Sequence, residues 1–297
     1  MYLHIKINTY MGQFLDCFQV SFVSLKKVSN IIKQDVIIIQ TVCVLMFIIG
    51  LLVHLNCLLL NVFNAKESIY YPAAYLENKY VMILLLLPQW FMMTYEELYI
   101  VWAVFYFAIH LKFQLDALTR YLKEKIIDLQ VDERICMEDK HYQDIVYRRL
   151  RFCAQRHVKL KQIFEETACK VASAALLLSI FTGSLCVIAA LYFILNNVNP
   201  KFNSIMYGVL INATLYHYSG NYYGQKIIDA SENFYSELIM CPYYYWNKRN
   251  RGILQMLLNG SKTPVAVSCY GLSEIGYPLM LSGVRFCYSV FALIKNF

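Results

Sequence analysis

Histidines and cysteines are the residues of this sequence best able to do chemistry, and their spacing matches no familiar catalytic or metal site. The six histidines form no His-Glu-x-x-His motif, and the sequence contains neither a Gly-x-Ser-x-Gly elbow nor a phosphate-binding loop. The ten cysteines form no Cys-x-x-Cys pair and fall mostly in apolar segments, which is typical of small apolar filler. We therefore expect a protein that is not an enzyme and that holds no metal and no cofactor.

The composition indicates an integral membrane protein. Hydrophobic residues make up 59% of the 297 residues, and charged residues only 16%. Soluble domains carry about 25% charged residues. The mean hydropathy of +0.43 points the same way. The net charge of +7 gives no reason to expect a nucleic-acid partner, because acidic residues are interleaved with the basic ones and no binding motif occurs.

The last apolar segment, residues 275–294, shows how such a chain would cross a membrane. Its 20 residues include a single charge, Arg285. As a helix they would rise about 30 Å, which matches the hydrocarbon core of a bilayer. A charge at that depth is costly unless it faces protein or water, so this helix should have one wet face. The alternative is a buried helix of a soluble protein, which the recurrence of long apolar runs upstream disfavours.

The other apolar runs predict further membrane spans. Together with the last segment, the predicted spans are residues 36–63, 79–110, 171–195, 202–223 and 275–294. The first of these is 28 residues long and carries no charge, so it can span with tilt. Residues 7–25 include Asp16 and are compatible with either a weak membrane helix or an interfacial helix.

Basic residues predict the orientation. Residues 111–162 hold 12 of the 27 Lys and Arg residues, and residues 225–262 form a second basic loop. Because basic segments stay in the cytoplasm, both should lie inside, and the C-terminus should lie outside. In the first block apolar residues recur at helical spacing, so we expect helices that continue into the cytoplasm.

Short motifs in the second half of the chain carry a family resemblance. Tyr216-His-Tyr-Ser-Gly-Asn-Tyr-Tyr-Gly-Gln, followed by Ser231, Tyr243 to Trp246, Arg251 and Lys262-Thr-Pro264, resembles the signature run of insect odorant receptors. The ending Arg285-Phe-Cys-Tyr-Ser-Val-Phe-Ala-Leu-Ile resembles the closing pattern of the same family. Further pieces resemble its fourth helix and the approach to its fifth: His110 to Leu118, Arg156-His157 and Ile163-Phe-Glu-Glu. The resemblance covers about residues 36–297.

This resemblance implies the fold class and the function. The fold would be all-α: a polytopic membrane helix bundle with about five to six transmembrane helices of an ancestral seven, and long cytoplasmic helical extensions. Residues 1–297 would form a single odorant-receptor-like domain. The function implied is a ligand-binding subunit of a heteromeric odorant-gated cation channel in the plasma membrane of olfactory neurons. Its partners would be a co-receptor in a hetero-tetramer, a small volatile odorant and membrane lipid.

The chain departs from the family pattern at its start. Residues 36–63 align with the family's third helix, and residues 7–25 are at best a remnant of the second. An incomplete gene model or a decayed, non-conducting copy would explain this. A G-protein-coupled type of receptor is a further alternative, disfavoured by its missing motifs and by the C-terminus expected outside.

The resemblance implies that an odorant binds among spans 36–63, 79–110 and 202–223. Apolar and aromatic walls would hold a volatile ligand mainly by burial. We assign His54, Trp90, Met93 and Tyr207 to this wall. For Trp90 and Met93 the alternative is a lipid-facing or core position, and for His54 it is a hydrogen bond to a neighbouring helix.

Four consecutive aromatic residues form a candidate subunit interface: Tyr243, Tyr244, Tyr245 and Trp246. Aromatic residues of this kind are frequent interface anchors. The alternative of equal weight is a belt at headgroup depth, where Tyr and Trp also gather.

The end of the last span is the candidate gate. Matching Tyr288-Ser289 to the family's closing pattern puts Phe291 at the pore constriction, with Lys295 one turn further on the same helical face. A ring of Phe side chains can close a pore by dewetting. The alternative is that Phe291 packs against a neighbouring helix.

Overall fold

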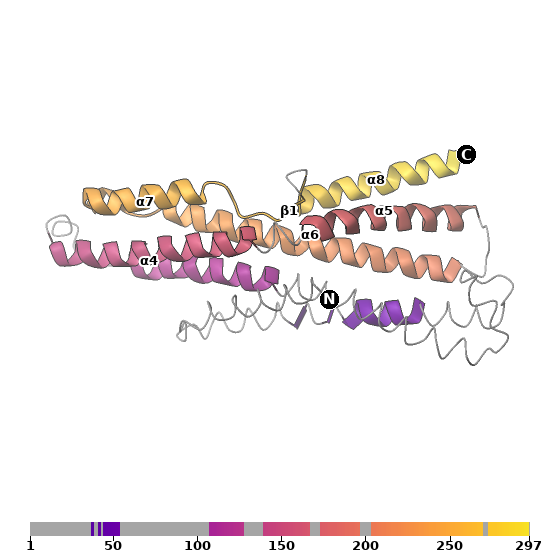
Figure 1. Ribbon diagram of the computed structural model, residues 1–297, viewed down its shortest axis with the longest axis horizontal. Coiled ribbons are helices and arrows are strands. Elements are labelled where there is room, and N and C mark those ends of the chain that lie inside the picture. The colour runs from indigo at the N-terminus through magenta and orange to yellow at the C-terminus, as the bar shows by residue number, and fades with distance from the viewer. Residues whose placement is uncertain are drawn as a thin grey trace. The chain divides into compact units, whose positions relative to one another are not determined.

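The regular structure of the described residues is helical apart from one small hairpin. This computed structural model describes residues 37–38, 41–42, 44–53, 107–127, 139–166, 173–196, 203–269 and 273–296. The hairpin pairs β1 (Ser268–Cys269) with β2 (Ser273–Glu274), antiparallel, with Ser268 opposite Glu274. The all-α prediction is therefore confirmed. Figure 1 shows the described helices.

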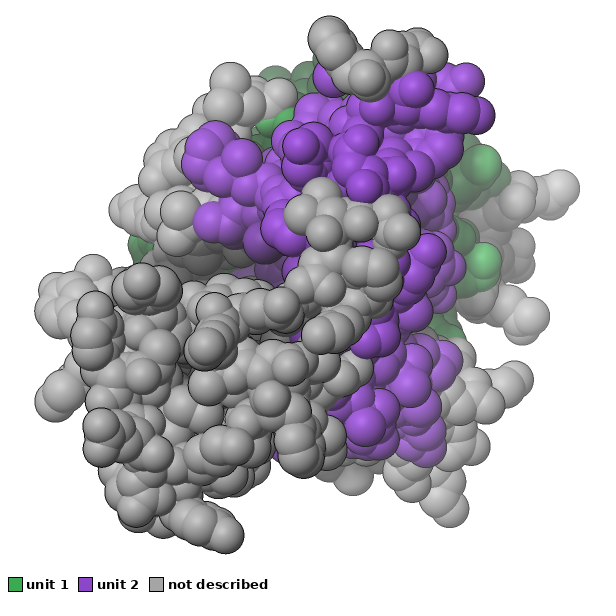
Figure 2. Space-filling model, turned by 90° about the vertical axis from the view of Figure 1, so that its right-hand side faces the viewer, with its two compact units in different colours: residues 1–35, 108–175, 223–274 green, residues 36–107, 176–222, 275–297 purple. Residues whose placement is uncertain are grey.

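The chain divides into two compact units, coloured in Figure 2. The described residues of unit 1 fall within Ala108–Ala175 and Tyr223–Glu274, and those of unit 2 fall within Val36–Phe107, Leu176–Tyr222 and Ile275–Phe297. The single-domain organisation expected for residues 1–297 stays a prediction.

Unit 1 is built from five helical pieces and the end of a sixth. Among its described residues these are the helical residues 108–122, the π-helical turn η3 (Lys123–Ile127), α4 (Lys140–Phe164), the last part of α6 (Asn203–Ile239), the 3-10 turn η6 (Tyr243–Tyr245) and α7 (Lys248–Ser261). Side-chain caps begin two of them. Asp139 Oδ1 accepts the backbone N–H of His141 at 2.8 Å, and Asn247 Oδ1 accepts that of Asn250 at 2.9 Å.

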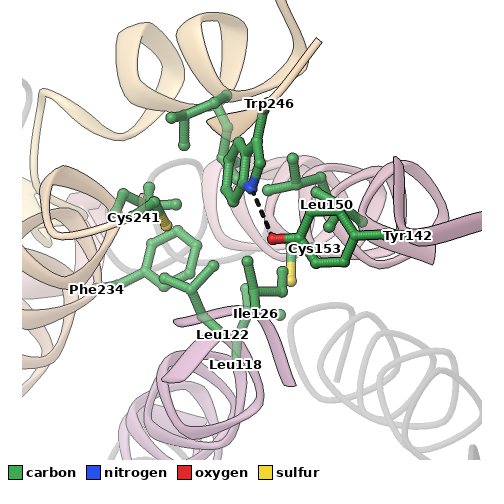
Figure 3. Close-up of a cluster of buried hydrophobic side chains, with 13 residues drawn as sticks. Leu118, Leu122, Ile126, Tyr142, Leu150, Cys153, Phe234, Cys241 and Trp246 are labelled. Carbon is green, nitrogen blue, oxygen red and sulfur yellow. Dashed lines mark hydrogen bonds between the residues drawn. The ribbon is translucent and has the colours of Figure 1, made fainter. Parts of the chain in front are cut away.

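Apolar side chains at helical spacing form the core of unit 1 (Figure 3). Each helix contributes a stripe of residues three or four positions apart, which places them on one face. The fully buried members come from different helices: Leu118, Leu122 and Ile126; Val146, Leu150 and Cys153; Phe234 and Leu238; and Trp246. Burying each large apolar side chain contributes about 1.5–3 kcal/mol to stability. Burial of one apolar face is therefore enough to hold together helices whose outer faces are mostly polar.

The helix α6 corrects one expectation. Residues 225–262 were expected to form a loop, but α6 continues without interruption from Asn203 to Ile239, and α7 follows. Buried Ile227, Phe234 and Leu238 explain the continuation, since they repeat at helical spacing on the face that packs into unit 1. With 37 residues, α6 is about 55 Å long and exceeds a bilayer core of about 30 Å.

Unit 2 contains the described membrane-type helices. The helix α5 (Ser173–Leu195) coincides with the predicted span 171–195, and α8 (Tyr277–Asn296) with the predicted span 275–294. Residues 44–53 are helical, within the predicted span 36–63. Residues 7–25, and all of the predicted span 79–110 except residues 107–110, lie outside the described residues.

Two glycines let the helices of unit 2 approach closely. A Cβ atom added to Gly208 of α6 would overlap Cγ2 of Val53, and one added to Gly183 of α5 would lie 3.0 Å from Nε2 of His217. Small residues at such positions allow helix backbones to pack where no hydrophobic effect drives them together. Gly208 therefore fixes α6 against the helix that contains Val53.

Candidate functional site

The candidate pore helix α8 (Tyr277–Asn296) is preceded by a buried, hydrogen-bonded residue. Gly276 is buried; its carbonyl accepts the backbone N–H of Met280 at 3.1 Å, and its own N–H donates to Oδ1 of Asn221 at 3.2 Å. Pro278 lies in the first helical turn, where its missing N–H leaves no helical hydrogen bond unmade. The start of α8 is thus held to α6 within unit 2.

Beyond its first turn α8 is apolar and uncovered. Residues 277–295 have the length and hydropathy of a membrane span, and none of the residues in this stretch is buried. Two hydroxyls are satisfied within the helix, because Ser282 donates to the carbonyl of Pro278 and Ser289 to that of Arg285. A largely apolar helix with no buried residue in its membrane-length stretch calls for lipid or other subunits around it.

The two predicted gate residues share a face near the end of α8. Phe291 is 39% exposed and Lys295 is exposed, and four positions separate them, which is about 40° around the helix. Leu293, two positions from Phe291, lies about 160° away and is also exposed. Since Phe291 is partly exposed, part of its side chain is available to a pore lined by several copies of α8.

On α6 the predicted pocket residue Tyr207 lies on the outer face. Its side chain is 54% exposed, and exposed Ile211 and Tyr218 follow it at helical spacing. Buried Ile205 lies about 160° around the helix from Tyr207, and the close-packed Gly208 lies about 100° from it. Tyr207 therefore does not line an enclosed space between α6 and residues 44–53. His54, Trp90 and Met93 lie outside the described residues.

An amide with an open acceptor lies on the inner face of α6. Asn212 is one turn beyond Gly208, and its Oδ1 atom is buried without a hydrogen-bond partner among the described residues. The sequence alone could not have identified Asn212 as a buried acceptor, because the burial of its oxygen depends on the packing of neighbouring helices.

The aromatic run divides into two parts with different surroundings. Tyr243 and Tyr244 are exposed, with ring centroids 5.7 Å apart, and Tyr245 packs against the core of unit 1. Trp246 is only 1% exposed, and its Nε1 donates to the hydroxyl of Tyr142 at 3.3 Å (Figure 3). Trp246 therefore offers almost no surface to a partner or to lipid.

A buried amide network fixes the start of α7 against α4. The Oε1 atom of Gln143 accepts from the backbone N–H of Asn247 at 2.9 Å and from Nδ2 of Asn250 at 2.8 Å. The Nε2 atom of Gln143 donates to the carbonyl of Tyr245 at 2.9 Å. These bonds position the aromatic turn, because they satisfy the carbonyl of Tyr245 and the backbone N–H of Asn247, the residues on either side of Trp246.

Burial also sets the protonation of three groups in unit 1. Burial lowers the pKa of the His157 imidazole to about 4, and the Lys161 ammonium adds to this shift. Burial raises the pKa of the Cys153 and Cys241 thiols to about 12 each. Neutral His157 stacks on Phe234, with ring centroids 5.2 Å apart. These groups are therefore uncharged core components rather than reactive ones.

Comparisons with known proteins identify the family. The family model described as 7tm Odorant receptor matches residues 19–288. No curated protein sequence matches the chain at a significant level. The structure is similar to that of the insect olfactory receptor OR5 from Machilis hrabei in complex with eugenol. The TM-score is 0.68 at 15% identity, covering 95% of this chain and 73% of that chain.

A second structure of OR5 from Machilis hrabei gives a TM-score of 0.69 at 15% identity, covering 99% of this chain and 76% of that chain. At this identity the likeness shows the fold, which is that of an all-α membrane helix bundle. The family match supplies the function class: a multi-pass membrane receptor and not an enzyme, as the sequence motifs predict. The chain belongs to the odorant receptor family.

Proposed function

We propose that this chain is a ligand-binding subunit of a heteromeric odorant-gated cation channel in the plasma membrane. The observation that supports this most is α8, an apolar helix long enough to span a bilayer with no buried residue in its membrane stretch. A helix lining a shared pore needs cover from lipid and from other subunits, and within one chain it stays uncovered. The proposed gate is Phe291, with Lys295 one turn beyond it.

The proposed ligand is a small, largely apolar volatile molecule. The structurally similar OR5 receptor is described in complex with eugenol, which has this character. Burial in an apolar pocket would contribute about 25 cal/mol per Å². We place the pocket among spans 36–63, 79–110 and 202–223. We propose His54, Trp90 and Met93 as wall residues. On α6 we assign the wall of the pocket to the inner face near Gly208 instead of to Tyr207.

The proposed partner is a co-receptor that completes a hetero-tetramer. An exposed apolar group at the end of α6 supports a contact surface in unit 1. Its members are Ile239, Met240, Tyr243 and Tyr244, and each has more than half of its surface accessible. Exposed apolar residues clustered in this way are typical of interaction sites. Because Trp246 and Tyr245 pack inward, we restrict the proposed interface to these four residues.

The proposed orientation puts residues 111–162 and 226–262 in the cytoplasm and the C-terminus outside the cell. The twelve basic residues of the first segment support this orientation. Unit 1, which contains the described parts of both segments, would then be cytoplasmic.

Recording from cells that express the chain with and without an insect odorant co-receptor tests the proposal. We expect currents evoked by a panel of volatile aromatics and alcohols only when both proteins are present. The reversal potential should be that of a channel that passes cations without selecting among them. Surface-expressed chain that gives no current with the co-receptor would instead favour a non-conducting copy. A response abolished by blocking G-protein signalling would favour a G-protein-coupled receptor.

A further inference from the structure

A buried amide on α6 holds the residue immediately before α8. Asn221 is 5% exposed, and its Oδ1 accepts the backbone N–H of Gly276 at 3.2 Å. Its Nδ2 donates to the carbonyl of His217 at 2.8 Å, so both polar atoms of the amide are used. The bond to His217 fixes which way the amide faces, and Oδ1 is thereby directed at Gly276.

Gly276 is the residue from which α8 starts. Its carbonyl accepts the first helical hydrogen bond, from Met280, and Ile275 beside it is buried. The membrane stretch that follows has no buried residue. The attachment of α8 to α6 in unit 2 is therefore concentrated at the start of the helix, where the Asn221 bond lies.

We infer that Asn221 is the positioning residue of α8: its amide ties Gly276, the residue before the helix, to α6 and restrains the pore-lining helix in its closed arrangement. The role of Asn221 in the pore rests on the proposed channel function. The hydrogen bond between Asn221 and Gly276 does not depend on that function. Loss of the bond would leave a buried backbone N–H without an acceptor and free the start of α8 to move relative to α6.

A second side chain on the same helix provides a matched control. Ser231 is 1% exposed, and its Oγ accepts the backbone N–H of Val265 at 3.0 Å, also in a buried position. This bond has the same chemistry, but it lies in unit 1 and holds the segment that follows α7 rather than the start of α8. A variant at Ser231 therefore loses an equivalent bond without touching the attachment of α8.

Hydrogen exchange of the purified full chain in detergent tests the tie directly. In Asn221→Leu, a variant with the same branching at Cγ but without an acceptor, we expect exchange at the Gly276 amide to accelerate by about 5- to 150-fold. Hydrogen exchange should also accelerate in the peptide that contains the first turn of α8. In Ser231→Ala the acceleration should appear at Val265 and leave Gly276 unchanged. Unaltered exchange at Gly276 in Asn221→Leu would overturn the inference.

Basal current, divided by the amount of protein at the cell surface, tests the effect on the pore and needs no odorant. With the co-receptor present, Asn221→Leu should raise this ratio by about fivefold or more, because α8 is no longer restrained. Asn221→Asp keeps an oxygen acceptor and should lie closer to the wild type, and Ser231→Ala should match the wild type. An unchanged ratio in Asn221→Leu would contradict the positioning role. A wild-type complex with no current would contradict the channel function, while exchange would still decide whether Asn221 anchors α8.

Discussion

The indole N–H of Trp246 donates a hydrogen bond to the hydroxyl of Tyr142 across 3.3 Å, inside the core of unit 1. The two residues are 104 positions apart, so the bond joins η6 and α7 to the first turn of α4. Trp246 thus stabilises the unit from within, and its exposed neighbours Tyr243 and Tyr244 are free to serve another purpose.

Truncation of Trp246 should destabilise unit 1. Trp246→Ala removes a fully buried ring and should lower the free energy of unfolding by about 3–5 kcal/mol. Trp246→Phe keeps most of the buried ring and loses the hydrogen bond to Tyr142, at a cost of about 1 kcal/mol. Thermal unfolding of the purified protein measures both changes. Equal melting temperatures for Trp246→Ala and the wild type would show that the ring is not part of the core.

Substitution of the exposed tyrosines should affect assembly and not stability. The double variant Tyr243→Ala, Tyr244→Ala removes apolar surface from the proposed interface, and its recovery with the co-receptor in co-purification should fall at least about tenfold, corresponding to about 1.4 kcal/mol. Its melting temperature should stay close to that of the wild type, because both side chains are exposed. Unchanged recovery with the co-receptor would favour a position at headgroup depth in the membrane.

The stability of unit 1 should depend on pH through His157. The folded state keeps the imidazole neutral, with a pKa of about 4, whereas an unfolded histidine has a pKa of about 6.5. Between these values the unfolded chain binds the additional proton, so stability falls as the pH falls through this window. We expect about 2 kcal/mol less stability at pH 5 than at pH 7 from this group.

Denaturant titration at the two pH values measures this change. His157→Phe keeps an aromatic ring against Phe234 and removes the titrating group, so the pH dependence should flatten by the same amount. If the free energy of unfolding changes equally between pH 5 and pH 7 in His157→Phe and in the wild type, other residues cause the pH dependence.

Labelling from outside intact cells should follow the proposed orientation. A cysteine introduced at exposed Gln155 of α4 or at exposed Gly252 of α7 should stay unlabelled by a membrane-impermeant thiol reagent, and one added after Phe297 should react. Permeabilised cells provide the control, in which all three sites should react. Reaction at position 155 in intact cells would reverse the orientation.

The helices that cross a membrane are the part of this fold most open to prediction from sequence. A long apolar run without charge defines α5, and one with Arg285 as its single interior charge defines α8. The predicted ends agree with the observed ends within two residues, because a bilayer demands about 20 predominantly apolar residues in a row. The continuation of α6 is harder to predict. Ile227, Phe234 and Leu238 are set among charged and aromatic residues, and their common face becomes visible only when α6 is treated as one long helix.

The long-range contacts could not be predicted from the residues alone. The amide network joins Gln143 to Asn250 across 107 positions, and nothing in either local sequence marks the other as its partner. Tyr243 and Trp246 look alike in a run of aromatics, yet the first is exposed and the second buried, because the turn at η6 points them in different directions. The family resemblance, in contrast, rests on motif order and is confirmed.

Recordings from the complex with the co-receptor test whether α8 lines a cation pore through the face that carries Phe291 and Lys295. Phe291→Ala should raise basal current by opening a hydrophobic constriction, and Lys295→Glu should raise cation conductance, because like charge no longer opposes entry. Leu293→Ala, on the opposite face of α8, is the matched control and should leave both quantities unchanged. If all three variants reach the cell surface and conduct like the wild type, α8 does not line the pore through this face.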